Sequence, residues 1–226
     1  MDSRSANFGD VDLFYEKHYD NVLRRGLVGR AQDRTHLALE KYAHAGTRFP
    51  SVLEVGAGRG EHFSFVKHDF DTYVETDIRP RDQPASETDG REFEVADAQH
   101  LHFADASFDR VVATCLLLHL ADPESALSEW RRVTRPGGQV DLLLPCDPGI
   151  VVRLARSLIT APAVKRSGFS GYGLFNARDH RNHVGGIDQL IRWVFRNDVL
   201  RITRYPFRLP SWNLNAYFIY SAVISS

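Results

Sequence analysis

The sequence predicts an α/β protein with a mostly parallel β-sheet, helices on both faces and an antiparallel hairpin at the C-terminal end. Three observations predict this fold. The apolar run 52–55 leads through a glycine-rich turn into a helix-like segment. Strand-like and helix-like segments then alternate to about residue 145, as in a parallel sheet. Two runs rich in β-branched and aromatic residues, 199–207 and 216–225, close the chain and predict the hairpin.

Composition indicates an ordinary globular protein. The chain has 226 residues, 43% hydrophobic and 25% charged, which suffices for one domain with a sizeable core. Its net charge of -1 argues against a nucleic-acid or membrane-surface binder. No apolar run reaches the roughly 18 residues of a membrane helix, and Met1–Arg4 begins no signal peptide. We therefore expect a cytoplasmic monomer or homodimer with no nucleic-acid partner, no membrane partner and no metal.

The N-terminal half predicts these elements in order. Helices are expected at 11–23 and 30–45, the second ending at Gly46 as a C-cap. The other expected elements are a strand at 51–55, a helix at 61–68, a strand at 72–76, a loop at 78–90, and strands at 93–96 and 107–114. The last strand is continuously apolar, which suits burial on both faces.

The C-terminal half begins with a well-marked helix. Asp122 is a suitable N-cap and Pro123 a suitable first residue, and the helix should run to Val133. A turn at 135–138 and a strand at 139–144 follow. Helices are also expected at 150–159 and 187–196, separated by a stretch that is small, aromatic and basic. A long link, 208–215, joins the two hairpin strands.

The glycine-rich turn has a chemical reading. Gly56, Gly58 and Gly60 allow a ligand to lie against bare backbone. Asp77 ends the next strand, where a carboxylate can bind ribose hydroxyls. The third glycine of a dinucleotide-binding turn is replaced by Glu61, and an acid there would repel a pyrophosphate. The pattern favours a nucleoside cofactor that has an ammonium group, which Glu54 could hold, and no phosphate.

With these motifs the sequence resembles the class I S-adenosylmethionine-dependent methyltransferases of the small-molecule type. Leu118-His119-Leu120 resembles the family's Leu-His-His-Leu run, with Leu118 in place of the first histidine, and 135–138 resembles its Lys-Pro-Gly-Gly turn. The resemblance covers about 50–145 and, loosely, the final hairpin. It implies a Rossmann-like, seven-stranded sheet in a single domain, 1–226. Its parts would be N-terminal lid helices (11–45), a cofactor-binding core (51–145), a substrate cap (150–186), and a final helix with the hairpin (187–226).

The resemblance also implies cofactor contacts. Asp97 would accept from the adenine amino group, Ala98 would contact the ring through its backbone, and Cys115 would offer its carbonyl to the ammonium. Tyr15 and Tyr19 would act as lid residues, although these helices could equally pack on the sheet edge. The full candidate set is Glu54, Gly56, Ala57, Gly58, Gly60, Asp77, Ile78, Asp97, Ala98, Cys115, Tyr15 and Tyr19.

Catalytic candidates are histidines, because histidine titrates near neutral pH. His119, His180 and His183 are the candidates, and a base is needed only if the acceptor must lose a proton. His119 could instead be a structural histidine bonded to backbone. The pair at 180 and 183 has no matching third metal ligand in the sequence. Candidate acceptor contacts are His119, Phe169, Tyr172, Phe175, Arg178 and Trp212.

The expected function is methyl transfer from S-adenosylmethionine to a nitrogen or oxygen atom of a small molecule, with S-adenosylhomocysteine as product. Aromatic residues of the cap favour a heteroaromatic or secondary-metabolite acceptor, whereas basic residues at 165–181 would suit an anionic one. A non-catalytic scaffold or sensor that binds S-adenosylmethionine is the alternative. A nicotinamide-dependent oxidoreductase is a third reading, against which Glu61 argues.

Overall fold

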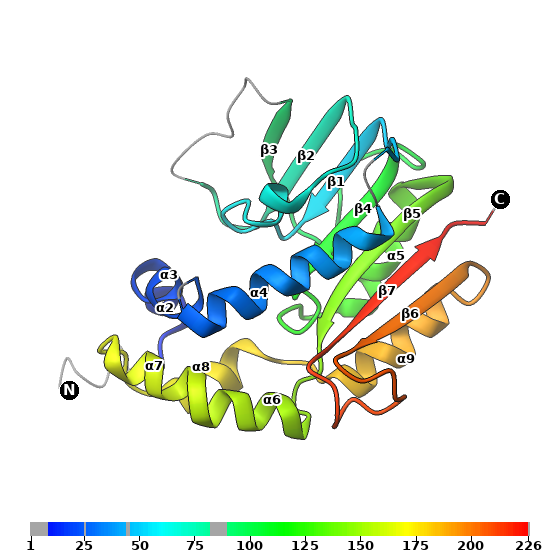
Figure 1. Cartoon of the computed structure of the whole chain (residues 1–226). Coiled ribbons are helices and arrows are strands. Elements are labelled where there is room, and N and C mark those ends of the chain that lie inside the picture. The colour runs from blue at the N-terminus through cyan, green and yellow to red at the C-terminus, as the bar shows by residue number, and fades with distance from the viewer. Residues whose placement is uncertain (1–8, 25, 44–45, 82–89, 226) are drawn as a thin grey trace.

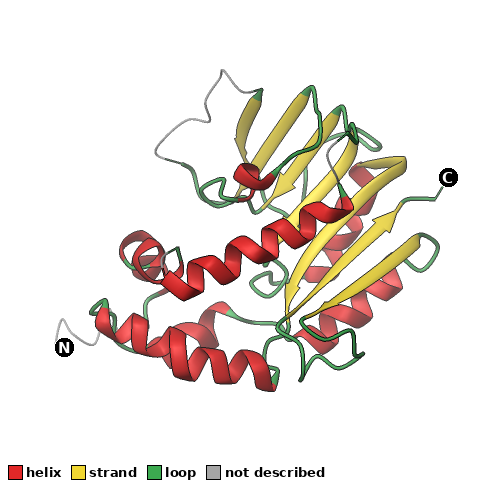
Figure 2. Cartoon of the chain, in the orientation of Figure 1, coloured by secondary structure: helices red, strands yellow, loops and turns green. Residues whose placement is uncertain are grey.

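A seven-stranded sheet lies at the centre of the computed structural model, which describes residues 9–24, 26–43, 46–81 and 90–225. The strand order is β3-β2-β1-β4-β5-β7-β6 (Figures 1 and 2). Strands β1 to β5 run parallel, and β7 is antiparallel to both β5 and β6. The predicted parallel sheet with a C-terminal antiparallel hairpin is confirmed.

The strands carry the carboxyl-end edge on which a ligand site can form. Their bounds are β1 (Ser51–Val55), β2 (Thr72–Asp77), β3 (Arg91–Val95), β4 (Phe108–Thr114), β5 (Thr134–Pro145), β6 (Val199–Tyr205) and β7 (Tyr217–Val223). The central strands β1 and β4 are almost wholly buried, as their continuous apolar runs predict. Because β1, β2, β4 and β5 are parallel, their carboxyl ends meet at one edge, where open α/β sheets bind ligands.

Helices cover both faces of the sheet (Figure 1). Their bounds are α2 (Val11–Lys17), α3 (Tyr19–Leu23), α4 (Gly26–Leu39), α5 (Pro123–Val133), α6 (Ile150–Ala155), α7 (Ala161–Arg166), α8 (Tyr172–Asp179) and α9 (Val184–Val194), with single turns η1 (Glu40–Tyr42), η2 (His62–Phe65) and the π-helical η3 (Arg156–Thr160). Helices α5 and α9 pack Trp130 and Ile191 into the large apolar core on one face. Helix α4 packs Leu39 on the other face.

Two helix predictions need correction. The helix expected at 61–68 is wrong, because only the 3-10 turn η2 forms. Val66 returns to extended backbone (φ -63, ψ 130), and the chain turns back so that Phe63, Val66 and Phe70 pack around Tyr73. The helix expected at 11–23 divides at His18 into α2 and α3.

Other boundaries differ less. The helix expected at 30–45 begins earlier, at Gly26, and its last turn is the 3-10 helix η1; residues 44–45, before the proposed cap Gly46, lie outside the described residues. Most of the expected loop at 78–90 also lies outside them. The stretch between the two expected C-terminal helices is more helical than predicted, because it holds α7, α8 and the start of α9.

The N-terminal helices and the cap share one small aromatic core. Phe14 of α2 packs edge-on against Phe169, with ring centroids 5.1 Å apart, and lies 4.3 Å from the ring of Phe175. Val22 and Val164 complete the buried part of this cluster. Aromatic contacts of this kind stabilise beyond the area they bury. Helices α2, α3, α7 and α8 therefore form one layer beside the carboxyl-end edge of the sheet (Figure 1).

A buried ionic network lies on the α4 face of the sheet. The Arg110 guanidinium donates to Asp141 through Nε at 2.8 Å and lies 2.8 Å from Glu40 Oε1 through Nη2. His62 Nε2 approaches the same Glu40 oxygen at 3.0 Å. Burial alone would raise the pKa of Glu40, but His62 and Arg110 lower it to about 2. The network therefore joins η1 and η2 to the two central strands β4 and β5.

We expect Arg110→Met to lower the free energy of unfolding by about 3–5 kcal/mol, because it leaves Glu40 and Asp141 as buried carboxylates without their cation. Urea denaturation measures the change. Arg48→Met removes an exposed pair with Asp71 and is the control, with an expected change below about 1 kcal/mol. Equal effects of the two substitutions would contradict the role given to the network.

Candidate active site

The glycine turn joins β1 to η2 at the carboxyl-end edge. Gly56, Gly58 and Gly60 have φ values of +68°, +57° and +80°, in the region that favours glycine. A Cβ on Gly56 would lie 2.6 Å from a Leu116 methyl group, and one on Gly60 would lie 2.7 Å from the Glu75 carboxylate. Around Gly58 the nearest atom would be 3.5 Å away. The turn is thus packed tightly at both ends and has room at its middle glycine.

Two side chains from the end of β2 hold Gly58. Asp77 Oδ2 accepts from the Gly58 amide at 2.9 Å, and Arg81 Nε donates to the Gly58 carbonyl at 2.7 Å. Arg81 is held in turn by the buried Glu75, 2.6 Å away. The side chain of Ile78, next to Asp77, is 67% exposed. An exposed apolar side chain beside a carboxylate suits a nucleoside, with its base on Ile78 and its ribose hydroxyls on Asp77.

Glu54 lies underneath the turn. Its side chain is buried, and Oε2 accepts a hydrogen bond from the Tyr73 hydroxyl at 2.8 Å. Burial raises the pKa of Glu54 to about 7, with Glu75 adding to the rise and His62 opposing it. The structure shows Glu54 bonded to β2. This position suits a residue that orients the turn, and the predicted contact of Glu54 with an ammonium group stays a prediction.

The remaining core candidates follow β3 and β4. Asp97 Oδ1 accepts from the Gln99 amide at 2.9 Å, which lowers the pKa of Asp97. Ala98 is buried, and its carbonyl accepts from Trp130 Nε1 at 3.0 Å. Cys115 directly follows β4 with φ +59°, a conformation that turns the chain sharply at the sheet edge. All three lie near strand ends at the same edge as the glycine turn.

The two lid tyrosines lie against the glycine turn. The Tyr15 and Tyr19 rings stack with centroids 5.4 Å apart. Burial raises the pKa of Tyr19, and the nearby Glu61 and Cys115 raise it further. Tyr19 is therefore close both to the residue after the turn and to the end of β4, as expected for a residue that covers the space between them.

Ion pairs bind the lid to the cofactor-binding core. Arg59, within the glycine turn, pairs with Asp20 of α3 and donates to the Tyr15 carbonyl at 3.2 Å. Arg79, two residues after Asp77, pairs with Asp12 of α2 at 2.9 Å, and its guanidinium lies 4.9 Å from the centre of the Tyr15 ring. The lid is thus attached at the two places where the core would bind the cofactor.

A histidine–carboxylate pair lies at the junction of lid, cap and sheet. His119, in the loop after β4, places Nδ1 3.3 Å from Asp179 Oδ2 and 3.2 Å from the Asp179 carbonyl oxygen. Both of these groups are acceptors, so Nδ1 must carry the proton. The Tyr15 hydroxyl also donates to Asp179 Oδ2, at 3.0 Å. Burial alone would raise the pKa of Asp179, but His119 and Tyr15 lower it.

A second pair adjoins the first. His180 Nδ1 lies 2.5 Å from Asp147 Oδ2, and Arg156 Nη2 approaches the same oxygen at 2.5 Å. These two partners lower the pKa of Asp147 to about 2, although burial opposes them. The His119 and His180 rings meet edge to face, with centroids 5.0 Å apart. Residues from β4, β5 and the cap therefore converge on one point.

Backbone contacts hold this arrangement. The Arg181 amide donates to the Leu118 carbonyl at 2.8 Å. The Asn182 side chain donates to the carbonyls of Leu117 and Leu120 at 3.0 and 2.7 Å. The segment that follows α8 is thus fastened to the loop that carries His119.

Other predicted residues lie elsewhere. His183 is the N-cap of α9, where its Nδ1 accepts from the Gly186 amide at 3.2 Å. Phe169 and Phe175 are buried in the core between lid and cap, and Tyr172 stacks on Phe175. The structure brings His119 and His180 together and leaves His183 apart. Roles in catalysis or acceptor binding for these residues stay predictions.

Arg178 and Trp212 have contacts with other parts of the chain. Arg178 donates to the Gly9 carbonyl at 3.2 Å. Trp212 packs against Gly149 at the start of α6 and lies near Gly185 of α9. Their predicted contacts with the acceptor stay predictions.

A metal ion could also bind at the junction. His119, Asp179 and His180 each offer a ligand atom, and these atoms all lie within 4.8 Å of one another. In the sequence, His180 and His183 form a pair of potential metal ligands with no third ligand at a matching spacing. The structure instead supplies Asp179 and a ligand from the loop after β4. Two imidazoles and a carboxylate are a common set for zinc.

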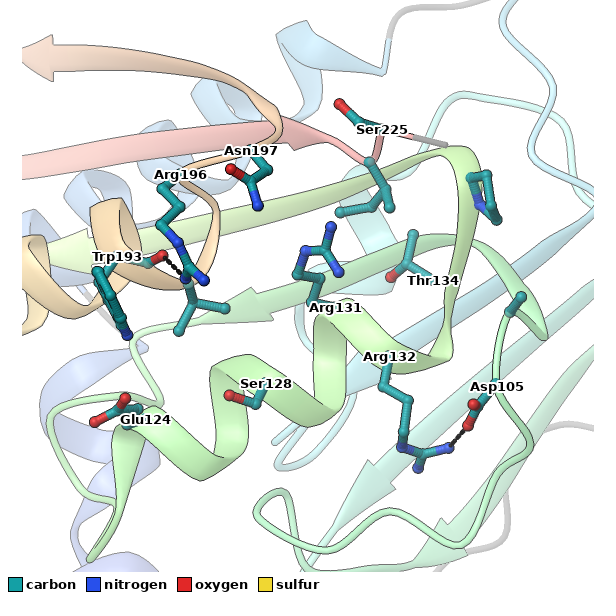
Figure 3. A pocket seen from close by; sticks show the side chains of 14 residues that line it. Asp105, Glu124, Ser128, Arg131, Arg132, Thr134, Trp193, Arg196, Asn197 and Ser225 are labelled. Carbon is teal, nitrogen blue, oxygen red and sulfur yellow. Dashed lines mark hydrogen bonds and ion pairs between the residues drawn. The ribbon is translucent and has the colours of Figure 1, made fainter.

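The groove in Figure 3 belongs to the opposite edge of the sheet. It has a volume of about 550 Å³ and lies between α5 and α9, near the start of β5. Its cations are already paired: Arg131 with Asp198, and Arg132 with Asp105. Arg196 lies over the Trp193 ring. None of the predicted site residues lines this groove, so the candidate site remains the carboxyl-end edge.

Comparisons with known proteins agree with this geometry. Residues 53–141 match the family model of a methyltransferase domain. A Thermotoga maritima methyltransferase, described as a possible histamine N-methyltransferase, superposes with a TM-score of 0.64 at 16% identity, over 94% of this chain and 98% of that chain. The N-methyltransferase NodS from Bradyrhizobium japonicum, solved with S-adenosylhomocysteine, superposes with a TM-score of 0.61 at 13% identity, over 97% and 99%.

Curated relatives match in sequence over the core. Phosphatidylethanolamine N-methyltransferase of Cereibacter sphaeroides is 34% identical over 105 residues, 43% of this chain and 52% of that protein. Methyltransferase GfsG of Streptomyces halstedii is 44% identical over 99 residues, 39% and 35% of the two chains. This chain thus spans about half of the first relative's length and about a third of the second's.

The match to a methyltransferase-domain model and the shared fold together indicate a class I S-adenosylmethionine-dependent methyltransferase domain. Residues 53–141 belong to the methyltransferase-domain family, and S-adenosylmethionine is the cofactor of this class. The geometry fits that ligand, because the turn has room at Gly58 and an exposed Ile78 adjoins a carboxylate. Sequence reasoning did not find Arg59, Arg79 and Arg81, which carry no motif, nor Asp147, which is close to His180 only in the fold.

We expect Asp77→Ala to weaken binding of S-adenosylhomocysteine about 10- to 100-fold, because it removes a charged hydrogen-bonding group worth about 1.5–3 kcal/mol. Calorimetric titration measures the change. Asp71→Ala, which removes an exposed acid paired with Arg48, is the control and should bind normally. An unchanged dissociation constant for Asp77→Ala would refute the ribose contact.

Glu54→Gln should flatten the pH dependence of stability. The folded-state pKa of Glu54, about 7, is raised above its ordinary value of 4.5. Its contribution to stability is therefore complete below pH 4.5 and is lost as the pH rises through 7. Between pH 4 and pH 8, the free energy of unfolding of the variant should rise by about 3 kcal/mol relative to that of the wild type. Urea denaturation measures this change. If the free energy of unfolding changed equally with pH in the two proteins, the raised pKa of Glu54 would be contradicted.

Proposed function

We propose that this protein transfers the methyl group of S-adenosylmethionine to an oxygen or nitrogen atom of a small molecule that must lose a proton in the reaction. The observation that carries the proposal is the pairing of His119 with Asp179 next to the cofactor turn and the lid. The relatives support S-adenosylmethionine as the methyl donor, and they include an N-methyltransferase and an O-methyltransferase of Penicillium expansum.

The His119 ring has the orientation of a general base. The Nδ1–H group of His119 donates a hydrogen bond to Asp179, so the lone pair of the ring is on Nε2. In the described part of the chain, Nε2 has no hydrogen-bond partner, and the side chain is 26% exposed. A carboxylate that orients a histidine also stabilises the imidazolium ion that forms when the ring accepts a proton. The pair can therefore accept the proton of a hydroxyl or an ammonium group.

The cofactor supplies an activated methyl group on a sulfonium, so the protein's work is alignment and proton transfer. As the acceptor's lone pair forms its bond to the methyl carbon, the carbon–sulfur bond breaks and the acceptor's proton passes to Nε2 of His119. Tyr15, which contacts Arg59 of the glycine turn and Arg79 beyond β2, and Tyr19, which stacks on Tyr15, would exclude water from the reacting groups. Fixed orientation of two reactants contributes up to about 7–11 kcal/mol.

The second pair would orient the acceptor. His180 carries its Nδ1 proton toward Asp147, and Arg156, whose guanidinium also reaches Asp147, places further N–H donors beside the two pairs. Hydroxyl or carboxylate oxygens on the acceptor would find donors there. We therefore propose an oxygen-rich small molecule, from biosynthetic metabolism in the cytoplasm, as the acceptor.

We expect His119→Ala to lower kcat about 10²- to 10⁴-fold, the usual contribution of a general base, with affinity for S-adenosylhomocysteine unchanged. Transfer of a tritiated methyl group to phenols, sugars and amines first identifies a working acceptor, and kcat is then measured on it. His102→Ala, which removes an exposed histidine paired with Glu94, is the control.

Three outcomes would contradict the proposal. Full activity of His119→Ala would show that His119 is not the general base. Tight binding of S-adenosylhomocysteine without transfer to any acceptor would favour the scaffold alternative. Loss of activity with EDTA, restored by zinc, would show that His119, Asp179 and His180 bind a metal instead of forming a base pair.

A further inference from the structure

The first helical run of the cap exposes large apolar side chains on its outer surface. Helices α6 and α7 are joined through η3 into one helical run, 150–166. Ile150, Leu154 and Leu158 are four residues apart along it and are 53%, 55% and 74% exposed. Large apolar side chains in a row on an exposed helix face indicate a surface that contacts a partner.

The apolar surface continues onto the hairpin link. The Val151 amide donates to the Asn213 carbonyl at 3.2 Å, which places the start of α6 beside the 208–215 link. Phe207 and Leu209, at the start of this link, are 54% and 52% exposed. Both segments lie along the lower margin of the molecule in Figure 1. The two elements therefore form one apolar margin, defined by Ile150, Leu154, Leu158, Phe207 and Leu209.

The two chain segments that carry this margin are basic. Residues 148–178 contain five cations and no acid, and residues 199–226 contain three cations and no acid, although the whole chain has a net charge of -1. Among the residues that the structure describes, Arg153, Lys165, Arg166 and Arg208 form no ion pair. The near-neutral net charge of the whole chain thus conceals basic segments, which the expectation of no membrane partner, drawn from net charge and from the length of the apolar runs, did not consider.

We propose that the apolar margin and its cations bind the surface of an anionic lipid bilayer. A helix with leucines on one face and Arg or Lys beside them lies in the interface of such a bilayer, with its apolar side chains among the acyl chains. Each cation near the surface adds electrostatic attraction. None of the helices in the described ranges is long and apolar enough to cross a membrane, so the contact is peripheral.

The lipid contact lies close to the site. The same helical run that presents Leu154 and Leu158 outward sends Arg156 inward to Asp147, the partner of His180. The bilayer would therefore lie one helix away from the histidine–carboxylate pairs. The binding itself depends only on the margin and not on the proposed activity.

Sedimentation with vesicles tests the proposal, using phosphatidylcholine alone and phosphatidylcholine with phosphatidylglycerol. We expect the full chain to sediment with the anionic vesicles, and high salt to weaken the binding. Leu154→Asp with Leu158→Asp should reduce the bound fraction on the order of tenfold or more, because charges replace the inserted side chains. Lys165→Gln with Arg166→Gln should reduce it less and lower the salt dependence.

Leu37→Asp is the matched control, because Leu37 is an exposed leucine on α4 and should not affect vesicle binding. Circular dichroism shows that each variant is folded, and failure of the wild-type chain to bind S-adenosylhomocysteine would concern the proposed function alone. No sedimentation of the wild-type chain, or equal sedimentation of the Leu154/Leu158 variant, would overturn the proposal. So would a dimer that dissociates on Leu158→Asp, because the margin would then be covered by a second copy.

Discussion

The bonds of Asn182 to the loop after β4 create the candidate active site. Together with the Arg181 amide, which donates to the Leu118 carbonyl, they fasten the cap to the loop that carries His119. With them, Asp179 and His180 are fixed within reach of His119. A neutral amide is well suited to this task, since it satisfies two backbone carbonyls at a strand end and adds no charge beside the pairs it positions.

The two faces of the sheet are stabilised by different physics. The α5 and α9 face is an apolar core centred on Trp130, and its contribution depends on buried area. The α4 face contains Arg110 between Asp141 and Glu40, and its geometry depends on pairing. Glu54 and its partner Tyr73 lie on this second face. The glycine turn therefore stands on the polar side of the sheet, where its position is set by directional bonds.

Short stretches of the sequence predicted local elements, but contacts between residues far apart in the chain could not be predicted from them. The glycine turn, the strand that ends at Asp77 and the two strands of the terminal hairpin follow from short patterns whose meaning depends on neighbours in the chain. The helix at 61–68 failed because its apolar residues serve a cluster around Tyr73 instead of a helix face. The partner of His119 is 60 residues away, and that of His180 is 33 residues away. No spacing rule connects them, because both depend on how the cap folds.

The shared aromatic core of lid and cap constrains how ligands exchange. Phe14 lies in contact with rings of the cap, so lifting the lid alone would expose that core to water. The lid and the cap are therefore coupled into a single clamp, hinged at its attachments to the sheet. Opening on the cofactor side must also move the acceptor side. Under the proposed function, donor and acceptor would then enter and leave through one motion of the whole layer.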